Sequence, residues 1–351
     1  MPHPSWIDFL NQQGVSQDST SASAATTDQN NSTLLVPLSD QTLISAEGPD
    51  TEKYLQGQLT CDLNRLNTEQ SLLGANCTPK GMVISAFRLF KPAEGQILMR
   101  LPLACADSAL TNLKKFAVFS KLTLELADQQ WVGIGLIGES AAECLQQLGV
   151  TPPTDINQQV LSDDLIVVRV AGATPRFELW SPLPHAEQLW QQLAKQTQLG
   201  SHQAWLAADI QAGLVQLGPE SLDSYIPQML NLQAVDGVGF DKGCYTGQEV
   251  VARLQFRGKL KKLMYAATVA VKELNEQPVS ISDSLVSSNG RVVGKILSYA
   301  HQDQHLVLQA IINKTAADNN DLHLHSAEGP TVSLLPLPYS IDPELFERPE
   351  R

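Results

Sequence analysis

Apolar residues along this chain follow the two-residue period of strands in some stretches and the longer period of helices in others. Strand patterns occur at 34–48, 81–90, 95–103 and 121–138. The first of these contains two short apolar runs around a polar turn, which predicts a hairpin. Helical patterns occur at 50–66, 104–119 and 184–200, and Ser201 can cap a further helix over 202–213 that stops at Gly213. Because strands and helices do not alternate strictly, the pattern favours an α+β fold over a parallel α/β sheet.

The two ends of the chain differ from this mixed pattern. Beyond residue 258, successive strand patterns at 260–271, 277–300, 304–313 and 322–337 are separated by Gly and Asn turns, which predicts a small, barrel-like all-β domain. Residues 11–33 are mostly Ser, Thr, Gln, Asn and Ala, and they cannot bury enough apolar surface to offset the entropy of ordering. We therefore predict a flexible N-terminal segment over 1–33.

Length and charge limit the classes of function. A chain of 351 residues exceeds one ordinary core, and 43% hydrophobic with 17% charged residues is typical of a globular protein. The formal net charge of −13 argues against a broad electrostatic contact with nucleic acid or anionic lipid, so any such contact needs a local basic patch. The densest basic run consists of Arg253, Arg257, Lys259, Lys261 and Lys262.

Targeting signals and metal motifs are both missing from the sequence. No lysine or arginine precedes Lys53, and no apolar stretch approaches the ~18 residues of a membrane span, so we expect a cytoplasmic protein. The five cysteines are widely spaced and form no CxxC pair, which predicts free thiols and no metal site. The glycines at 133, 135 and 138 match a dinucleotide fingerprint, but without a second βαβ half an ordinary strand-to-helix turn is favoured.

Cys244 is the candidate for chemistry. Thr246 and Glu249 have the spacing of a capping box, which predicts a helix that begins near Thr246 and leaves Cys244 just outside its positive end. The helix dipole and Lys242 would there favour the thiolate, and Gly243 would permit a tight loop with positive φ. The alternative is a small buried apolar residue, and no His or Asp at a recognisable spacing suggests a base.

Several motifs together resemble the YgfZ family. The octapeptide KGCYTGQE at 242–249 is similar to its signature, and it is preceded by YIPQ at 225–228 and NLQ at 231–233. The N-terminal string YLQGQLT at 54–60, with RLF at 88–90 and FSK at 119–121, is similar to further family motifs. The similarity extends from about residue 34 to about residue 341.

This resemblance implies a fold like that of the folate-binding T-protein of glycine cleavage. It implies a discontinuous folate-binding-type α+β domain over 34–125 and 201–255, a ferredoxin-like domain over 126–200 and a C-terminal β-barrel over 256–345. Tetrahydrofolate or a derivative is the implied cofactor. Trp205 matches a tryptophan that contacts folate in bacterial members, whereas Gln41 replaces a second one, and the remaining predicted contacts are Tyr245, Gln248, Glu249 and Arg253.

The implied function is support of the assembly, maintenance or repair of iron–sulfur enzymes. These enzymes include the radical enzyme that methylthiolates tRNA. In the present chain, Cys244 would be the functional thiol, with Lys242 beside it. On this interpretation the protein is not a conventional enzyme, and neither membrane association nor stable direct tRNA binding is expected. Two alternatives stay open: a folate-dependent aminomethyl or methyl transferase, and a non-enzymatic adaptor that docks on a client through residues 253–262.

Overall fold

The computed structural model describes residues 3–15, 33–128, 130–162, 164–274 and 277–346. The chain divides into two compact units. Unit 1 comprises Met1–Leu55, Leu63–Leu72 and Phe87–Trp205, and unit 2 comprises Gln56–Asp62, Leu73–Ala86 and Leu206–Arg351. The finer division into three folded domains remains a prediction.

Unit 1 is built around a six-stranded sheet whose order is β11–β1–β7–β10–β9–β8. Its strands are β1 (Leu34–Pro37), β7 (Trp131–Ile137), β8 (Gln159–Ser162), β9 (Leu165–Val170), β10 (Arg176–Pro182) and β11 (Gln198–Leu199). Helices α4 (Ala141–Gln147) and α5 (Leu183–Leu193) complete this ferredoxin-like part. The helix predicted to extend to Gly200 is shorter in the structure. It ends at Leu193, and the edge strand β11 follows.

A second, five-stranded sheet has the order β3–β4–β5–β2–β6. Its strands are β2 (Gln41–Glu47), β3 (Leu72–Cys77), β4 (Val83–Ala93), β5 (Gln96–Pro102) and β6 (Thr123–Leu126), with α2 (Thr51–Gln56) and α3 (Ala106–Phe116) in the connections. Within unit 1, buried side chains from β2, β4 and β5 join those of β1, β9 and β10 in one apolar cluster. The sheet mixture confirms the predicted α+β class.

The predicted hairpin at 34–48 is wrong. Strand β1 pairs with β7 and β11, whereas β2 pairs with β5 and β6 in the other sheet. The polar turn at Ser39 and Asp40 therefore carries the chain from one sheet to the next.

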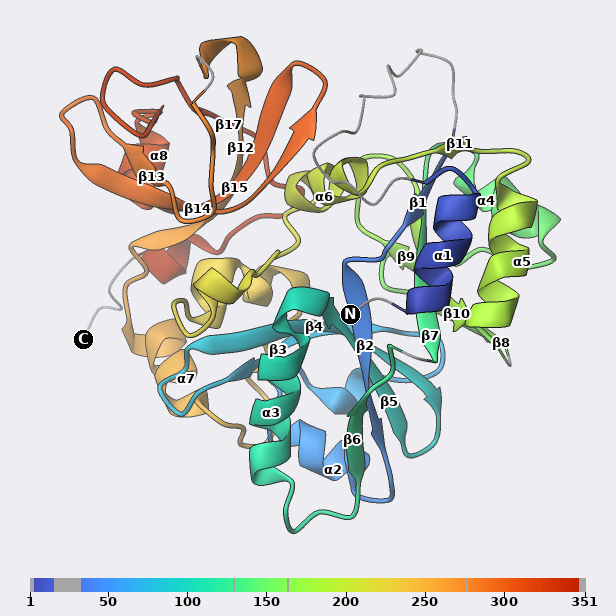
Figure 1. Ribbon diagram of the computed structural model, residues 1–351. Helices are drawn as coiled ribbons and strands as arrows, with labels where there is room; N and C mark the ends of the chain where they lie inside the picture. Colours follow the sequence, from blue (N-terminus) through green and yellow to red (C-terminus); the bar gives the residue numbers. More distant parts are fainter. Residues whose placement is uncertain (1–2, 16–32, 129, 163, 275–276, 347–351) are drawn as a thin grey trace. The chain divides into compact units, whose positions relative to one another are not determined.

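The start of the chain also differs from the prediction of a flexible segment over 1–33. Residues Pro4–Gln12 form helix α1, which places Trp6, Phe9 and Leu10 in the core cluster of α5 and the six-stranded sheet. Figure 1 shows α1 and α5 side by side on one face of that sheet. The apolar spacing i, i+3, i+4 explains why these residues fold. The remainder of the predicted segment, 16–32, lies outside the described residues.

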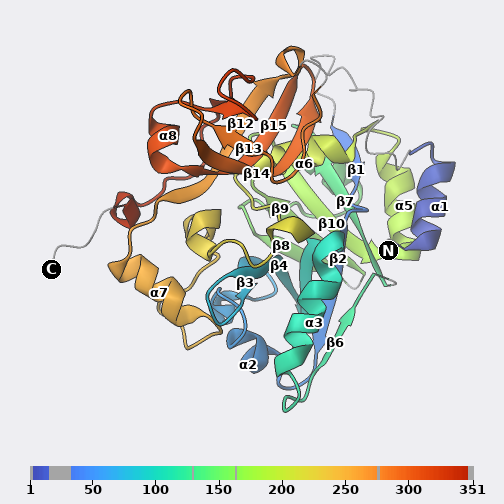
Figure 2. The same ribbon diagram turned by 60° about the vertical axis from the view of Figure 1, so that its left-hand side comes forward.

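Unit 2 contains the predicted C-terminal β-barrel. Its sheet has the order β16–β13–β14–β15–β12–β17. The strands are β12 (Lys262–Ala270), β13 (Ser284–Val286), β14 (Val292–Gln302), β15 (His305–Asn313), β16 (His323–Leu324) and β17 (Ser333–Leu334), and α8 (Lys314–Asp318) lies beside them (Figure 2). The barrel closes because the β16 segment bonds back to residues 330–332, as in the 2.9 Å bond from Leu324 N to Pro330 O.

Helices α6 (His202–Gln211) and α7 (Gln248–Arg257) precede the barrel in the chain. The Ser201 hydroxyl accepts a 3.2 Å bond from Ala204 N at the start of α6, as expected for a helix cap.

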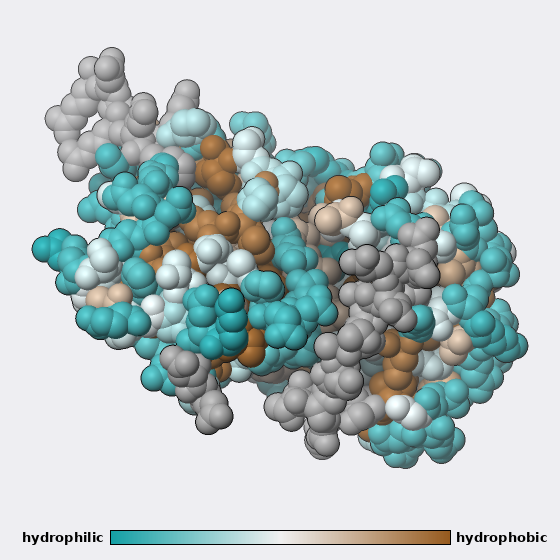
Figure 3. Space-filling view, turned by 90° about the horizontal axis from the view of Figure 1, so that it is seen from above, coloured by the Kyte–Doolittle hydropathy of each residue, from teal (hydrophilic) through white to brown (hydrophobic). Residues whose placement is uncertain are grey.

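One face of the molecule is mostly hydrophilic, with smaller groups of exposed apolar side chains (Figure 3). Among the described residues, no helix is both long and apolar enough to cross a bilayer.

Candidate functional site

Cys244 is exposed, whereas Cys61, Cys77, Cys105 and Cys144 are buried. Burial raises the pKa of the Cys77 thiol to about 12, so that sulfur stays protonated and enclosed. Cys244 lies in the loop between Gly239 and Gln248, in unit 2. It is therefore the one cysteine of the five that a reagent or partner in solution can reach, and the alternative of a buried packing cysteine does not describe it.

Lys242 holds the loop that carries Cys244. Its ammonium donates three hydrogen bonds to backbone carbonyls, to Gln56 O at 2.8 Å, Leu59 O at 2.6 Å and Cys61 O at 2.7 Å. All three N–H donors of a lysine are thereby used. Loss of solvent lowers the pKa of Lys242 to about 8, so the side chain still carries its proton at neutral pH.

The hydrogen bonds of Lys242 give it a structural role that the sequence did not predict. Its donors are directed to the segment 56–61 rather than to the thiol of Cys244, so the side chain anchors the loop and does not pair with the sulfur. The string YLQGQLT at 54–60 and the octapeptide at 242–249 thus meet through these bonds. The sequence identified both motifs but gave no sign that one supplies the carbonyl acceptors for the other.

Tyr245 and Thr246 anchor the loop on the other side of Cys244. The Tyr245 ring is buried, and it lies 5.0 Å from the Lys242 nitrogen in a cation–π contact. Burial, followed by the nearby Cys77, raises the pKa of Tyr245. Thr246 N donates a 3.2 Å bond to Gly57 O. With both flanks held, Cys244 and Gly243 are the exposed part of the turn.

The predicted capping box does not form. Helix α7 begins at Gln248, its N-cap is Gly247 with φ of 87°, and no side chain caps it. A Cβ at Gly247 would lie 2.5 Å from Thr78 O, so close approach to the 78–81 turn requires glycine there. Glu249 is exposed and Gln248 half-buried at the first turn. Gly243 has no positive φ and no atom within 4 Å of an added Cβ, contrary to its expected role.

The other family motifs of unit 2 support this region from beneath. Gln228 Nε2 donates a 2.7 Å bond to Val251 O in α7, and Asn231 Nδ2 donates a 2.8 Å bond to Met264 O in β12. Thr60 Oγ1 donates a 2.6 Å bond to Gly237 O and accepts one from Ala75 N. These buried bonds fix the segments on which the Cys244 loop rests.

Trp205 belongs to unit 1 and is 1% exposed. It packs in the cluster between the two sheets, where the Arg176 guanidinium lies 4.8 Å from its ring centre. A Cβ on Gly135 would lie 2.6 Å from the same ring, so this glycine serves close packing rather than a dinucleotide turn. The burial of Trp205 favours a core role, and a contact with folate would require the cluster to open.

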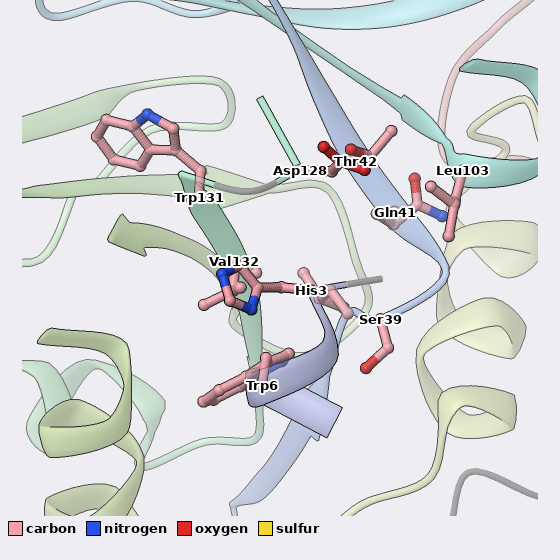
Figure 4. A pocket seen from close by; sticks show the side chains of 11 residues that line it. His3, Trp6, Ser39, Gln41, Thr42, Leu103, Asp128, Trp131 and Val132 are labelled. Carbon is pink, nitrogen blue, oxygen red and sulfur yellow. The ribbon is translucent and has the colours of Figure 1, made fainter. Parts of the chain in front are cut away.

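Gln41 lines a small pocket of unit 1 with His3, Trp6, Ser39, Asp128 and Trp131 around it (Figure 4). Its amide donates a 2.7 Å bond to Asp40 and accepts a 3.3 Å bond from Arg100. The pocket volume is about 20 Å³. That is room for about one water molecule, whereas sites for larger ligands measure about 300 Å³ or more. This pocket is too small for a folate, and the folate contacts of Gln41 and Trp205 stay predictions.

Comparison with known proteins gives the family. The chain is 35% identical over 311 residues to the tRNA-modifying protein YgfZ of Serratia proteamaculans, covering 88% of this chain and 93% of that protein. It is 35% identical over 316 residues to the protein of the same name from Colwellia psychrerythraea, covering 88% and 94%. The chain belongs to the YgfZ family. No family model matches the chain.

The fold of this YgfZ family member is that of the T-protein. The aminomethyltransferase T of the glycine cleavage system from Bartonella henselae superposes with a TM-score of 0.70, at 17% identity, over 88% of this chain and 86% of that one. The predicted T-protein-like fold is thereby confirmed. Among the described residues, no group of three or more His, Cys, Asp or Glu side chains could hold a metal ion.

Proposed function

We propose that this chain supports iron–sulfur enzymes that modify tRNA, with Cys244 as its functional thiol, folate as a ligand and the cytoplasm as its location. The observation that carries the proposal is the presentation of Cys244. It is exposed while Lys242, Tyr245 and Thr246 around it are held by hydrogen bonds or burial. A thiol held out to solvent by an ordered loop is suited to react with, or to ligate, a group on a partner.

The relatives support the tRNA part of the proposal, because those cited are called tRNA-modifying proteins. Within that role, we propose the radical enzyme that methylthiolates tRNA as a client. The T-protein fold supports folate as a ligand. No chemical step is assigned to folate. Tyr245, Gln248, Glu249 and Arg253 remain its predicted contacts.

The test is replacement of the native gene with the Cys244→Ala form. We expect the methylthiolated fraction of cellular tRNA to fall to the level of the deletion strain, at equal protein abundance and unchanged melting temperature. Gly243→Ala is the matched control, because it alters the adjacent residue in open space and keeps the thiol. Full methylthiolation of tRNA in the Cys244→Ala strain would show that the function does not need this thiol.

The likeness to aminomethyltransferase T favours one second candidate, a folate-dependent one-carbon transferase. This candidate predicts steady turnover of an aminomethyl or methyl donor by the purified protein with tetrahydrofolate. We expect no turnover, and sustained product formation would establish the transferase instead.

A further inference from the structure

Five cations form a basic ridge on α7 and the segment after it. They are Arg253, Arg257, Lys259, Lys261 and Lys262, and all five are exposed. Within the part of the chain that the structure describes, none of them forms an ion pair. In a chain of net charge −13, a row of cations without acidic partners is a local exception that fits an anionic ligand.

The five cations of the ridge are close together in the sequence. Arg253 and Arg257 are one helical turn apart, which places them about 6 Å from each other along the axis. Beyond Gly258, Lys259, Lys261 and Lys262 are exposed while Leu260 is buried. A group of exposed cations can contact several phosphates along the backbone of a polyanion.

An aromatic ring lies within the ridge. Phe256 is 62% exposed, and its ring makes an edge-to-face contact with Phe240 at 5.9 Å between centroids. The contact supports the ring on one side while most of its surface meets solvent. Exposed aromatic rings among cations are the features with which proteins bind single-stranded nucleic acid, because bases stack on the ring while lysine and arginine neutralise phosphates.

We propose that the basic ridge binds RNA, with phosphates on the five cations and a base stacked on Phe256. An acidic polypeptide would satisfy the cations but would leave the planar ring without a planar partner, so the combination favours RNA. The choice of tRNA as the RNA rests on the proposed function. The proposed contact with RNA is weak and sensitive to salt. It therefore differs from stable tRNA binding, which the acidic composition of the chain disfavours.

The test measures binding of a fluorescently labelled tRNA transcript to the purified full chain by anisotropy, between about 50 and about 200 mM salt. In Arg257→Gln/Lys259→Gln/Lys261→Gln, we expect the slope of log K against log salt to become shallower by about 2 to 3, since each lost phosphate contact removes about 0.7 to 0.9. The dissociation constant at about 100 mM salt should also rise at least tenfold, because the lost phosphate contacts still contribute at that salt concentration.

Three control variants separate the parts of the proposal. Phe256→Leu keeps an apolar side chain against Phe240 but removes the planar ring, so it should weaken binding and leave the salt slope unchanged. Lys114→Gln/Lys115→Gln removes exposed positive charge from α3 and should bind tRNA as the wild type does. Cys244→Ala should also bind normally, so that failure of the ridge and failure of the thiol function are distinguishable.

The proposal is overturned if the wild-type chain does not bind the transcript, or if the α3 control loses as much affinity as the ridge variant. It is also overturned if labelled poly-glutamate binds the ridge more tightly than tRNA and is indifferent to Phe256→Leu. That outcome would assign the surface to an acidic protein partner.

Discussion

The buried carboxylate of Glu178 should be one of the most sensitive positions of unit 1. It is 0% exposed and receives the Arg100 guanidinium at 2.5 Å, with Arg88 Nε at 3.9 Å and Trp180 Nε1 at 3.3 Å. Burial alone would raise the pKa of Glu178, but the charges of Arg100 and Arg88 outweigh it and the pKa is lowered. The carboxylate therefore balances two arginines inside the protein.

Glu178→Gln keeps the shape of this side chain and removes its charge. Removing one partner from a buried ion pair costs about 3–5 kcal/mol, because the remaining buried charge loses its compensation. With a urea m-value of about 2–3 kcal/mol/M, we expect the unfolding midpoint to fall by about 1 M or more. Glu139→Gln is the matched control in the same unit, since Glu139 is exposed, and it should change stability by less than about 0.5 kcal/mol.

The pH dependence gives the prediction a second check. Because the folded pKa of Glu178 is below that of the unfolded chain, its contribution is fully present above about pH 4.3 and is lost as the pH falls through the folded value. The stability difference between wild type and Glu178→Gln should thus be constant near neutral pH and shrink in acid. A difference below about 1 kcal/mol at pH 7, or one that does not shrink in acid, would refute the reasoning.

Three further predictions follow from packing and exposure. Gly247→Ala should lower the free energy of unfolding in urea by about 1–3 kcal/mol, since the φ of Gly247 is 87° and an added Cβ would meet a backbone carbonyl. Gly243→Ala should lower it by less than about 0.5 kcal/mol. Equal effects of the two substitutions would contradict the loop geometry. Leu10→Ala should destabilise unit 1 by about 2–5 kcal/mol, and a neutral result would show that α1 is not part of the core. Iodoacetamide should add one label to the native protein, at Cys244 by peptide mass spectrometry, and labelling of Cys77 at a similar rate would be inconsistent with its burial.

Element type could be predicted from the sequence because it depends on local patterns. The alternation in the barrel strands, the apolar spacing in α3, and the Ser201 cap and Gly213 stop that bound α6 are properties of a few consecutive residues. Pairing could not be predicted in the same way. The hairpin expected at 34–48 fails because β1 finds its partners in β7 and β11, far along the chain. Such pairings depend on which faces are buried in the finished fold.

Helix α1 was missed although its signal is present in the sequence. Pro4 at the first helical position, followed by Trp6, Phe9 and Leu10 at helical spacing, predicts a short amphipathic helix. The polar composition of the following residues instead favours a flexible segment, and the prediction over 1–33 follows that composition. A short helix gains most of its stability from tertiary packing, and the cluster that accepts Trp6 comes from distant elements.

The octapeptide illustrates how far motif reasoning extends at a site. The sequence identified Cys244 as the reactive candidate and correctly placed a helix after it, but it assigned Lys242 to the thiol and Thr246 to a cap. Both assignments used neighbours in sequence. The actual acceptors of the Lys242 ammonium are carbonyls of 56–61, and carbonyl acceptors leave no trace in side-chain identity.

The motif residues therefore fall into two groups, those that form hydrogen bonds within the protein and the one that is exposed to solvent. Lys242, Thr60, Gln228 and Asn231 each place a polar side-chain group on a backbone atom of another segment, and such bonds are satisfied within the protein. Cys244 is held by none of them and meets solvent. An exposed thiol adds nothing to the packing of a loop that its neighbours already fix, and under the proposed function the order of the surrounding residues would serve to present this one sulfur to a partner.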